Sequence, residues 1–294
     1  MNQDGHLRRL IREAVEAAVE KAAGPACVML SGGIDSSTVA SFATELPLVT
    51  GWYDAKGFDE REYARLVADG REWLEVEITP DDLVECAGAA VKALQGLRCG
   101  PGAIGQYVVD RAIADEGFQT ILTGEGGDEL FGGYARQLIV AGFPRPPGYE
   151  TMRLPAGYPA TLEAALEVEW AALRQLCKVD ERVAGAHGLT VTPPLLDPWL
   201  VGWVHTRPAD ERIWKRLLRS AMRGTVPDRI LDRQGKQGFP APFVAWAQED
   251  PVRGFLEERI GYVPDPREPY SRQWWYDLQD SYQPALAIST EFAQ

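Results

Sequence analysis

Short apolar runs alternate with amphipathic segments through the first 124 residues of the chain. Segments with the length of a strand occur at residues 26–30, 46–54, 72–78 and 119–124. They are either mainly apolar or alternate apolar with polar residues. Between them, apolar positions recur every three or four residues, which is the spacing of a helix with one buried face. This alternation of strands and helices predicts an α/β fold, a parallel sheet with helices on both faces.

Local signals predict where several helices begin. Residues 7–22 form an amphipathic helix that stops before a Gly-Pro pair. Asp59, with Glu62 three residues later, predicts a capping box at the start of a helix. Thr79 followed by Pro80 predicts the N-cap and first residue of another helix. Further helices are expected over residues 36–46 and from the glycine-rich stretch 96–105 to about residue 116.

The pattern changes after residue 134. Residues 142–159 are rich in Pro and Gly, and the apolar positions from Leu162 to Val183 predict one long amphipathic helix. No strand is predicted beyond this point, so we interpret the remainder as a mainly helical lobe. The expected organisation is an N-terminal helix at 1–24, an α/β core at 25–141 and a helical C-terminal lobe at 142–294.

Charge and composition exclude several classes of protein. The chain has 294 residues and a formal net charge of −13, so it has no general attraction for phosphate backbones, and nucleic acid is not expected as a partner. No apolar run approaches the roughly 18 residues that cross a bilayer. The N-terminus lacks the pattern of a signal peptide, and the four cysteines form no CxxC pair. We therefore expect no membrane partner and a cytoplasmic location.

The first chemical motif, SGGIDSS at residues 31–37, lies between a predicted buried strand and a helix. Gly32 and Gly33 let the backbone approach an anion, and the free N–H groups of a helix start attract negative charge. Asp35 would repel a phosphate unless a divalent cation lay between them, so we assign Asp35 as a Mg²⁺ ligand. The motif therefore predicts a pyrophosphate site. Hydroxyl groups supply further donors: Ser31, Ser36 and Ser37.

The second motif, TGEGGDELFGGY at residues 123–134, follows the last predicted strand at the same edge of the sheet. So many glycines weaken a fold, which indicates backbone that passes close to a ligand. We assign Asp128 as the second Mg²⁺ ligand and Glu125 as the group that binds or deprotonates an incoming amine. Helix-end or packing roles are expected for Glu129, Phe131 and Tyr134. Nucleotide contacts are also expected at Met29, Thr123 and Gly124.

A third motif, RQGKQGFPAP at residues 233–242, places Lys236 between two glycines on a Pro-rich loop. An ammonium group there would stabilise charge that develops on a reacting phosphate. A solvated surface lysine is the alternative interpretation. Arg233 is a second phosphate candidate.

These motifs resemble those of a known enzyme family. SGGIDSS resembles the SGGxDS signature of the PP-loop ATP pyrophosphatases. GEGGDELFGGY resembles a segment of the synthetase domain of asparagine synthetases and their relatives, including β-lactam synthetases and lasso-peptide cyclases. PDRILDRQGKQGFPAPFVAW is similar to the family's C-terminal segment. The resemblance spans about residues 7–250 and implies an adenine nucleotide alpha hydrolase-like fold, with a PP-loop ATP-binding core at 25–141.

The resemblance implies an ATP- and Mg²⁺-dependent, AMP-forming amide ligase. Such an enzyme adenylates a carboxylate, releases pyrophosphate and passes the acyl group to ammonia or an amine. Asp35 and Asp128 would hold Mg²⁺, and Lys236, which precedes a Gly-Phe pair in the family's manner, would contact the phosphates. Glu125 matches the asparagine synthetases, because β-lactam synthetases have Tyr at this position.

Two departures from the family bear on the substrate. No glutaminase domain is expected, because Met1 is followed by Asn2 rather than a nucleophilic Cys, and the nearest Cys is Cys27 on a predicted strand. Thr190 and Thr192 stand where many relatives carry Glu and Arg, which puts aspartate in doubt as the acid. We therefore expect natural product biosynthesis, with a small-molecule or peptide carboxylate as substrate. A separate glutaminase or a carrier protein is an optional partner.

Two other interpretations stay open. Another PP-loop activity, such as tRNA modification, would usually need catalytic cysteines or a basic face. A non-catalytic scaffold would have lost the chemistry and would serve a partner protein. Within the ligase interpretation, both cyclisation and intermolecular transfer fit the motifs.

Overall fold

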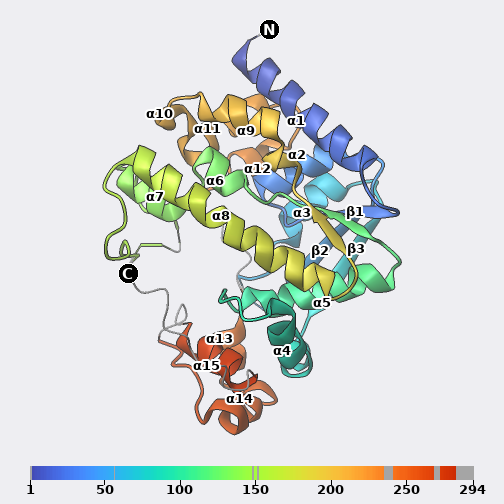
Figure 1. The fold of residues 1–294 in the computed structure, drawn as a ribbon, viewed down its shortest axis with the longest axis vertical. Coiled ribbons are helices and arrows are strands. Elements are labelled where there is room, and N and C mark those ends of the chain that lie inside the picture. The colour runs from blue at the N-terminus through green and yellow to red at the C-terminus, as the bar shows by residue number, and fades with distance from the viewer. Residues whose placement is uncertain are drawn as a thin grey trace.

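Five parallel strands form a single sheet in the order β3-β2-β1-β4-β5 (Figure 1). The computed structural model describes residues 2–55, 57–147, 149–150, 152–234, 241–267 and 272–282. The strands are β1 (Ala26–Met29), β2 (Leu48–Tyr53), β3 (Trp73–Ile78), β4 (Thr120–Leu122) and β5 (Thr190–Thr192). The chain builds outward from β1 in one direction and then from β4 in the other. The loops after β1 and β4 therefore border the crevice where such sheets bind ligands.

Helices surround this sheet, so the predicted α/β fold is confirmed. Before β4 lie α1 (Gln3–Glu20), α2 (Ile34–Phe42), α3 (Arg61–Ala68), α4 (Pro80–Leu94) and α5 (Gly102–Asp115). Between β4 and β5 lie α6 (Gly127–Phe131), α7 (Ala135–Val140) and α8 (Leu162–Gly185). After β5 lie η1 (Pro194–Leu196), α9 (Pro198–His205), α10 (Ala209–Arg212), η2 (Ile213–Lys215), α11 (Arg216–Ala221), α12 (Asp228–Leu231), α13 (Phe243–Trp246), α14 (Val252–Ile260) and α15 (Gln273–Tyr282). Within the described ranges, every helix is too short or too polar to cross a bilayer.

The sheet separates two apolar cores, because successive strand residues point to opposite faces. In β1, Cys27 belongs to one core and Val28 to the other. The neighbouring strands repeat the pattern: Leu48 and Leu122 join Val28, whereas Val49 and Ile121 join Cys27. The continuous apolar runs at 26–30 and 119–124 are thus explained by burial on both faces.

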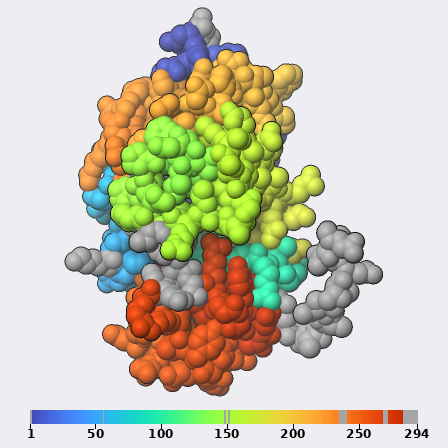
Figure 2. All heavy atoms as spheres, turned by 90° about the vertical axis from the view of Figure 1, so that its left-hand side faces the viewer, coloured from blue at the N-terminus to red at the C-terminus, as the bar shows by residue number. Residues whose placement is uncertain are grey.

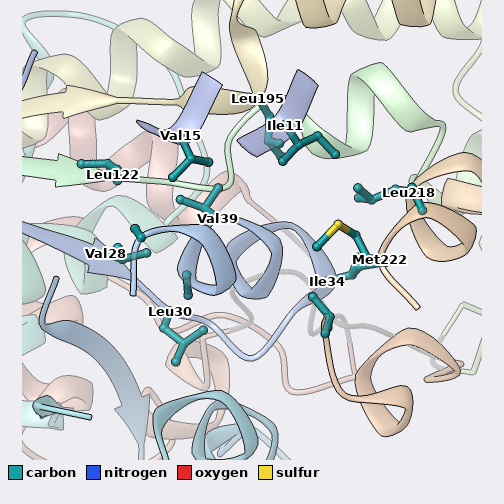
Figure 3. Close-up of a cluster of buried hydrophobic side chains, with 14 of the residues drawn as sticks. Ile11, Val15, Val28, Leu30, Ile34, Val39, Leu122, Leu195, Leu218 and Met222 are labelled. Carbon is teal, nitrogen blue, oxygen red and sulfur yellow. The ribbon is translucent and has the colours of Figure 1, made fainter. Parts of the chain in front are cut away.

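The first core is covered by α1, α2, α9 and α11. Figure 3 shows Ile11 and Val15 from α1 close to Val39 from α2, above Val28 of β1. Ile11 and Val15 are fully buried, as the three-to-four spacing of residues 7–22 predicts. This packing holds the start of α2 at the end of β1.

The second core lies under α4, α5 and α8 and extends to the C-terminal helices. Trp274 and Trp275 of α15 are fully buried in it, and α14 and α15 both contact α4. These helices form the lower end of the molecule in Figures 1 and 2. Helices after residue 142 therefore contribute to both cores. The division of the chain between residues 141 and 142 stays a prediction.

Two local predictions for helix starts had different outcomes. The Thr79 hydroxyl accepts from the Asp82 N–H at 3.2 Å, and the Asp82 carboxylate accepts from the Thr79 N–H at 2.9 Å, so α4 begins with a capping box and Pro80 is its first residue. The capping box predicted at Asp59 is wrong. The helix α3 begins two residues later, at Arg61, and the Arg61 guanidinium binds the Asp59 carboxylate at 2.8 Å.

The prediction of no strand after residue 134 is also wrong. Thr190–Thr192 forms β5 and pairs in parallel with β4, from Thr120–Thr190 to Leu122–Thr192. This edge strand has only three residues and none of them is fully buried, so it leaves no apolar run in the sequence. The rest of this part of the chain is helical, as expected.

Candidate active site

The loop after β1 has the tight shape that its glycines predict. Gly32 has a φ of +74°, and a Cβ there would lie 2.8 Å from the Ala64 backbone nitrogen. The Ser36 hydroxyl accepts from the Ser31 N–H at 3.1 Å and donates to the Gly33 carbonyl at 3.2 Å. The loop is thereby fixed against the first turn of α2, whose N–H groups lie beside it.

The glycines of the second motif allow this segment to pack against the first loop. A Cβ at Gly124 would lie 2.5 Å from the Ser36 backbone nitrogen, and one at Gly127 would lie 2.4 Å from the Asp35 carboxylate. A Cβ at Gly133 would lie 2.0 Å from a carboxylate oxygen of Asp128. The sequence predicted close approach to a ligand. The structure shows close approach to the two assigned aspartates.

Lys215 links these two aspartates. Its ammonium group forms an ion pair with Asp35 and another with Asp128, at 2.5 Å in the second case. The Lys215 side chain is 4% exposed, and those of Asp35 and Asp128 are 8% and 21% exposed. Two carboxylates this close repel each other, and the buried ammonium group compensates the repulsion.

A strained turn positions Lys215. Trp214 and Lys215 have φ values of 59° and 55°, in the left-handed region that costs about 1–2 kcal/mol for each non-glycine residue. The Trp214 N–H donates to the Gly132 carbonyl at 2.8 Å, which fixes the turn against the second motif. Strain of this kind persists where the surrounding structure imposes it, and it often marks functional sites.

Sequence reasoning missed Lys215. The residue lies three and seven positions before the buried Leu218 and Met222, so it falls on the apolar face of the segment 213–222. A lysine on an apolar face needs a buried acidic partner. The spacing of Lys215 from Leu218 and Met222 could have identified it as a buried lysine, but this spacing does not identify its acidic partner.

The donor set at this position suits Mg²⁺ that arrives with phosphates. Asp35 and Asp128 supply two carboxylates, and Mg²⁺ typically takes one or two from the protein and completes its shell with phosphate oxygens and water. Among the described residues no group of three or more His, Cys, Asp or Glu side chains is arranged to hold a metal by itself. The buried ammonium group of Lys215 shows that the pair already accommodates a cation.

A small basic cavity borders Asp128. Its volume is about 140 Å³, and Gly32, Gly33 and Asp128 line it. Basic side chains also line it: Lys215, Arg219 and Arg233. Cations beside a glycine loop at a helix start form a suitable environment for a pyrophosphate group. Arg233, the secondary phosphate candidate from the sequence, lines this cavity and pairs with Glu60, and its role stays a prediction.

A second, larger cavity of about 350 Å³ is lined by both aspartates. It is lined by most of the predicted nucleotide-contact and catalytic residues: Met29, Ser31, Asp35, Ser36, Thr123, Gly124, Glu125 and Asp128. The main chain of β5 borders the same region, because the Thr123 N–H donates to the Thr192 carbonyl at 3.1 Å. Residues from β1, β4 and β5 therefore meet here, as the sheet order requires.

Three other residues named in the sequence analysis have different outcomes: Ser37, Lys236 and Tyr134. Ser37 is fully buried in α2 and lines neither of these two cavities. Lys236 lies outside the described residues, so its role stays a prediction. Tyr134, expected to pack, lines both cavities and donates from its hydroxyl to the Glu129 carboxylate. Burial raises the pKa of Glu129.

Comparison with known proteins identifies the family of the chain. The family model described as Asparagine synthase matches residues 6–157 and 159–273. The chain is 27% identical to asparagine synthetase [glutamine-hydrolyzing] 3 of Arabidopsis thaliana, over 81% of this chain and 44% of the relative. It is 24% identical to a putative asparagine synthetase [glutamine-hydrolyzing] of Mycobacterium bovis, over 79% of this chain and 47% of that protein.

A third relative is matched over a shorter region. A probable asparagine synthetase [glutamine-hydrolyzing] of Schizosaccharomyces pombe is 30% identical over 43% of this chain and 28% of its own length. The chain thus spans less than half the length of each of these relatives. Because the family model covers most of the chain, the protein belongs to the asparagine synthetase family.

Proposed function

We propose that this protein is an ATP-dependent amide ligase that activates a carboxylate as an acyl-adenylate. The observation that carries the proposal is the arrangement around Asp35 and Asp128. A basic cavity beside the glycine loop borders Asp128, and a larger, separate cavity with Glu125 is lined by both aspartates. This arrangement suits the separation of a departing pyrophosphate from the reacting acyl group.

In the first step, an oxygen of the substrate carboxylate attacks the α-phosphorus of ATP. The bond from this phosphorus to the bridging oxygen of the β-phosphate breaks, and pyrophosphate leaves with that electron pair. Lys215, Arg219 and Arg233 line the cavity where the new negative charge would be stabilised. Asp35 and Asp128 would hold Mg²⁺, which when bound neutralises phosphate charge.

In the second step, a neutral amine attacks the acyl carbon of the adenylate. The carbon–oxygen bond to AMP breaks, and the amine nitrogen loses one proton as the amide forms. Glu125 lines the cavity in which the acyl group would lie, and we assign its carboxylate as the acceptor of that proton. Lys236 is proposed as a further contact to the phosphates.

The finer proposals concern the pathway and the source of the nucleophile. Thr190 and Thr192 are the first and last residues of β5, which lies next to Thr123. The family resemblance implies that many relatives carry Glu and Arg in place of these two threonines. We infer that the acid differs from aspartate and belongs to a specialised biosynthetic pathway. Ammonia from a separate glutaminase, or a second amine substrate, would then complete the reaction.

The test separates the two steps. The protein is mixed with ATP, Mg²⁺ and a panel of carboxylic acids, with ammonium or amines. AMP and pyrophosphate are expected with a suitable acid, whereas ADP and phosphate would refute adenylation. Asp35→Ala is expected to abolish both steps. Failure of the wild type to bind Mg²⁺-ATP by calorimetry would favour a scaffold instead.

Glu125→Gln tests the assigned base. We expect ATP–pyrophosphate exchange to persist, because adenylation does not use this carboxylate, and amide formation to fall by about 10²- to 10⁴-fold. Glu258→Gln, on an exposed face of α14, is the matched control and is expected to leave both rates unchanged. Equal loss of both rates in Glu125→Gln would contradict the assignment.

A further inference from the structure

The larger cavity is lined by carboxylates without a basic side chain among them. Six of its described lining residues are acidic: Asp35, Asp110, Glu125, Asp128, Glu129 and Asp180. No Lys, Arg or His occurs among the described lining residues. A cavity of this composition favours a ligand that carries a cationic group.

Four of the six carboxylates are already accounted for. Asp35 and Asp128 pair with Lys215, and Glu129 accepts from the hydroxyl of Tyr134. Glu125 is the proposed base for the amine. Asp110 and Asp180, which come from α5 and α8 rather than from the two loops, have no role in the chemistry proposed above.

Asp110 is the unusual member of this pair. It is 1% exposed, and among the described residues neither of its carboxylate oxygens has a hydrogen-bond partner. Gln106 lies near both Asp110 and Asp180 and partly offsets the rise of their pKa values. A buried carboxylate without a donor carries a desolvation penalty, so its position in a cavity wall indicates a ligand that supplies the donor.

We propose that Asp110 and Asp180 bind a positively charged nitrogen group, an ammonium or a guanidinium, on the substrate that occupies the larger cavity. The inference rests on the proposed function and adds a substrate class to it. The carboxyl group to be activated would lie near the loops after β1 and β4. The cationic group would lie under α5 and α8, which pack against each other.

Charge at the two aspartates supports this assignment. Burial and the nearby Asp180 raise the pKa of Asp110, and burial raises the pKa of Asp180 to about 7. The negative charges of Glu129 and Glu181 also raise the pKa of Asp180. A bound cation reverses these effects, because an opposite charge at hydrogen-bonding distance stabilises the ionised carboxylate.

One competing ligand has related chemistry. The amino group of adenine is also an N–H donor, and the nucleotide is expected to contact residues of the same cavity. Adenine is neutral, so it satisfies a hydrogen bond without compensating the charge of two carboxylates. An experiment that separates dependence on the acid from dependence on ATP therefore distinguishes the two.

The first measurement is ATP–pyrophosphate exchange by the full chain with matched acids. The cationic probes are 5-aminopentanoate, 6-aminohexanoate and 4-guanidinobutyrate, and the neutral probes are pentanoate and hexanoate. We expect the cationic acids to exceed the neutral ones by about 10- to 100-fold in kcat/KM, as for a charge-assisted hydrogen bond. Asp110→Asn and Asp180→Asn are each expected to remove most of that advantage while leaving the KM for ATP unchanged.

The second measurement does not depend on turnover. Binding of n-butylguanidinium and n-butylammonium to the wild type is followed by ligand-observed NMR, with n-butanol as the neutral probe. We expect the two cations to bind the wild type and to lose binding in Asp110→Asn. Asp115→Asn, on the exposed end of α5, is the matched control and is expected to bind like the wild type.

Each outcome decides the inference. It is overturned if neutral acids match the cationic ones, if the cations bind Asp110→Asn as well as the wild type, or if this variant raises only the KM for ATP. Cation binding without any exchange would keep the inference and reject the proposed function. Thermal unfolding of each variant confirms that it is folded before it is compared.

Discussion

At the scale of single residues, one side chain connects parts of the chain that lie 180 positions apart. Lys215 joins the Asp35 loop to the Asp128 segment, and all three side chains are largely buried. The site is therefore assembled by charge as well as by packing. Removal of the ammonium group would leave two carboxylates close together without the cation that bridges them.

Lys215→Met tests this account because Met keeps most of the side-chain volume and loses the charge. We expect the free energy of unfolding to fall by about 3–5 kcal/mol, the usual cost of breaking a buried ion pair. Millimolar Mg²⁺ should recover part of the loss, since it replaces the cation. Urea unfolding with and without Mg²⁺ measures both effects. Lys178→Met, exposed on α8, is the control, and equal stability of the two variants would contradict the prediction.

Gly127 provides a second test at this scale. Its Cβ position lies 2.4 Å from the Asp35 carboxylate, so Gly127→Ala must displace that side chain. We expect a loss of about 1–3 kcal/mol, as for overpacking in an interior, together with loss of Mg²⁺-ATP binding. Gly185→Ala is the control, because a Cβ at Gly185 meets nothing within 4 Å. Alanine is also more favourable than glycine in a helix, so this variant is expected to be at least as stable as the wild type. A Gly127→Ala protein as stable as the wild type would show that the close approach is not required.

At the scale of helices and strands, the local signals differ in what they specify. The Thr79 capping box formed because its partners are three residues apart and belong to one turn. The box at Asp59 failed because α3 begins two residues later, at Arg61, so the Asp59 carboxylate accepts from the Arg61 N–H at 3.0 Å as well as from its guanidinium. A motif predicts a cap only when the helix begins at the next residue.

Thr79→Ala measures the contribution of the α4 cap. We expect a loss of about 1 kcal/mol in the free energy of unfolding, because the hydroxyl that accepts from the Asp82 N–H is removed. Urea denaturation gives the value. Thr44→Ala, an exposed threonine, should change stability by less than half as much. A larger loss of stability in Thr44→Ala than in Thr79→Ala would mean that packing alone, without the cap, stabilises α4.

Sequence patterns predicted those elements whose signal is local. The runs around β1 and β4 are apolar because both faces of each strand are buried, and the two loops carry their glycines within a few residues. The edge strand β5 gave no such signal. Lys215 was missed because its role depends on a left-handed turn and on partners far away in the sequence. Asp110 looked like any polar helix residue, since its burial depends on the elements that pack against α5.

At the scale of the whole molecule, the buried acids make stability depend on pH. Asp180 has a pKa of about 7 in the folded protein, above its ordinary value of 3.8. Between these values the folded state holds a proton that the unfolded state has lost, so the contribution of Asp180 to stability falls as the pH rises from about 4 to 7. This direction is opposite to that of a carboxylate in an ion pair.

Asp180→Asn should remove this dependence. We expect the variant to exceed the wild type in free energy of unfolding by about 1 kcal/mol or more at pH 8 and to match it near pH 4. Urea unfolding at several pH values measures the difference, which includes the change that the loss of the Asp180 charge causes in the pKa of Asp110. Asp115→Asn serves as the control on an exposed site. A constant difference between wild type and Asp180→Asn at all pH values would count against the raised pKa.

The opposite linings of the two cavities have a consequence for inhibitor design. Asp128 and Tyr134 border both spaces, so a single compound that passes this boundary can reach each of them. We expect a tight binder to be a dipolar molecule, with a phosphonate at the arginine-lined end and an amine or amidine at the other. A uniformly anionic mimic of the nucleotide would gain affinity in only half of the available space.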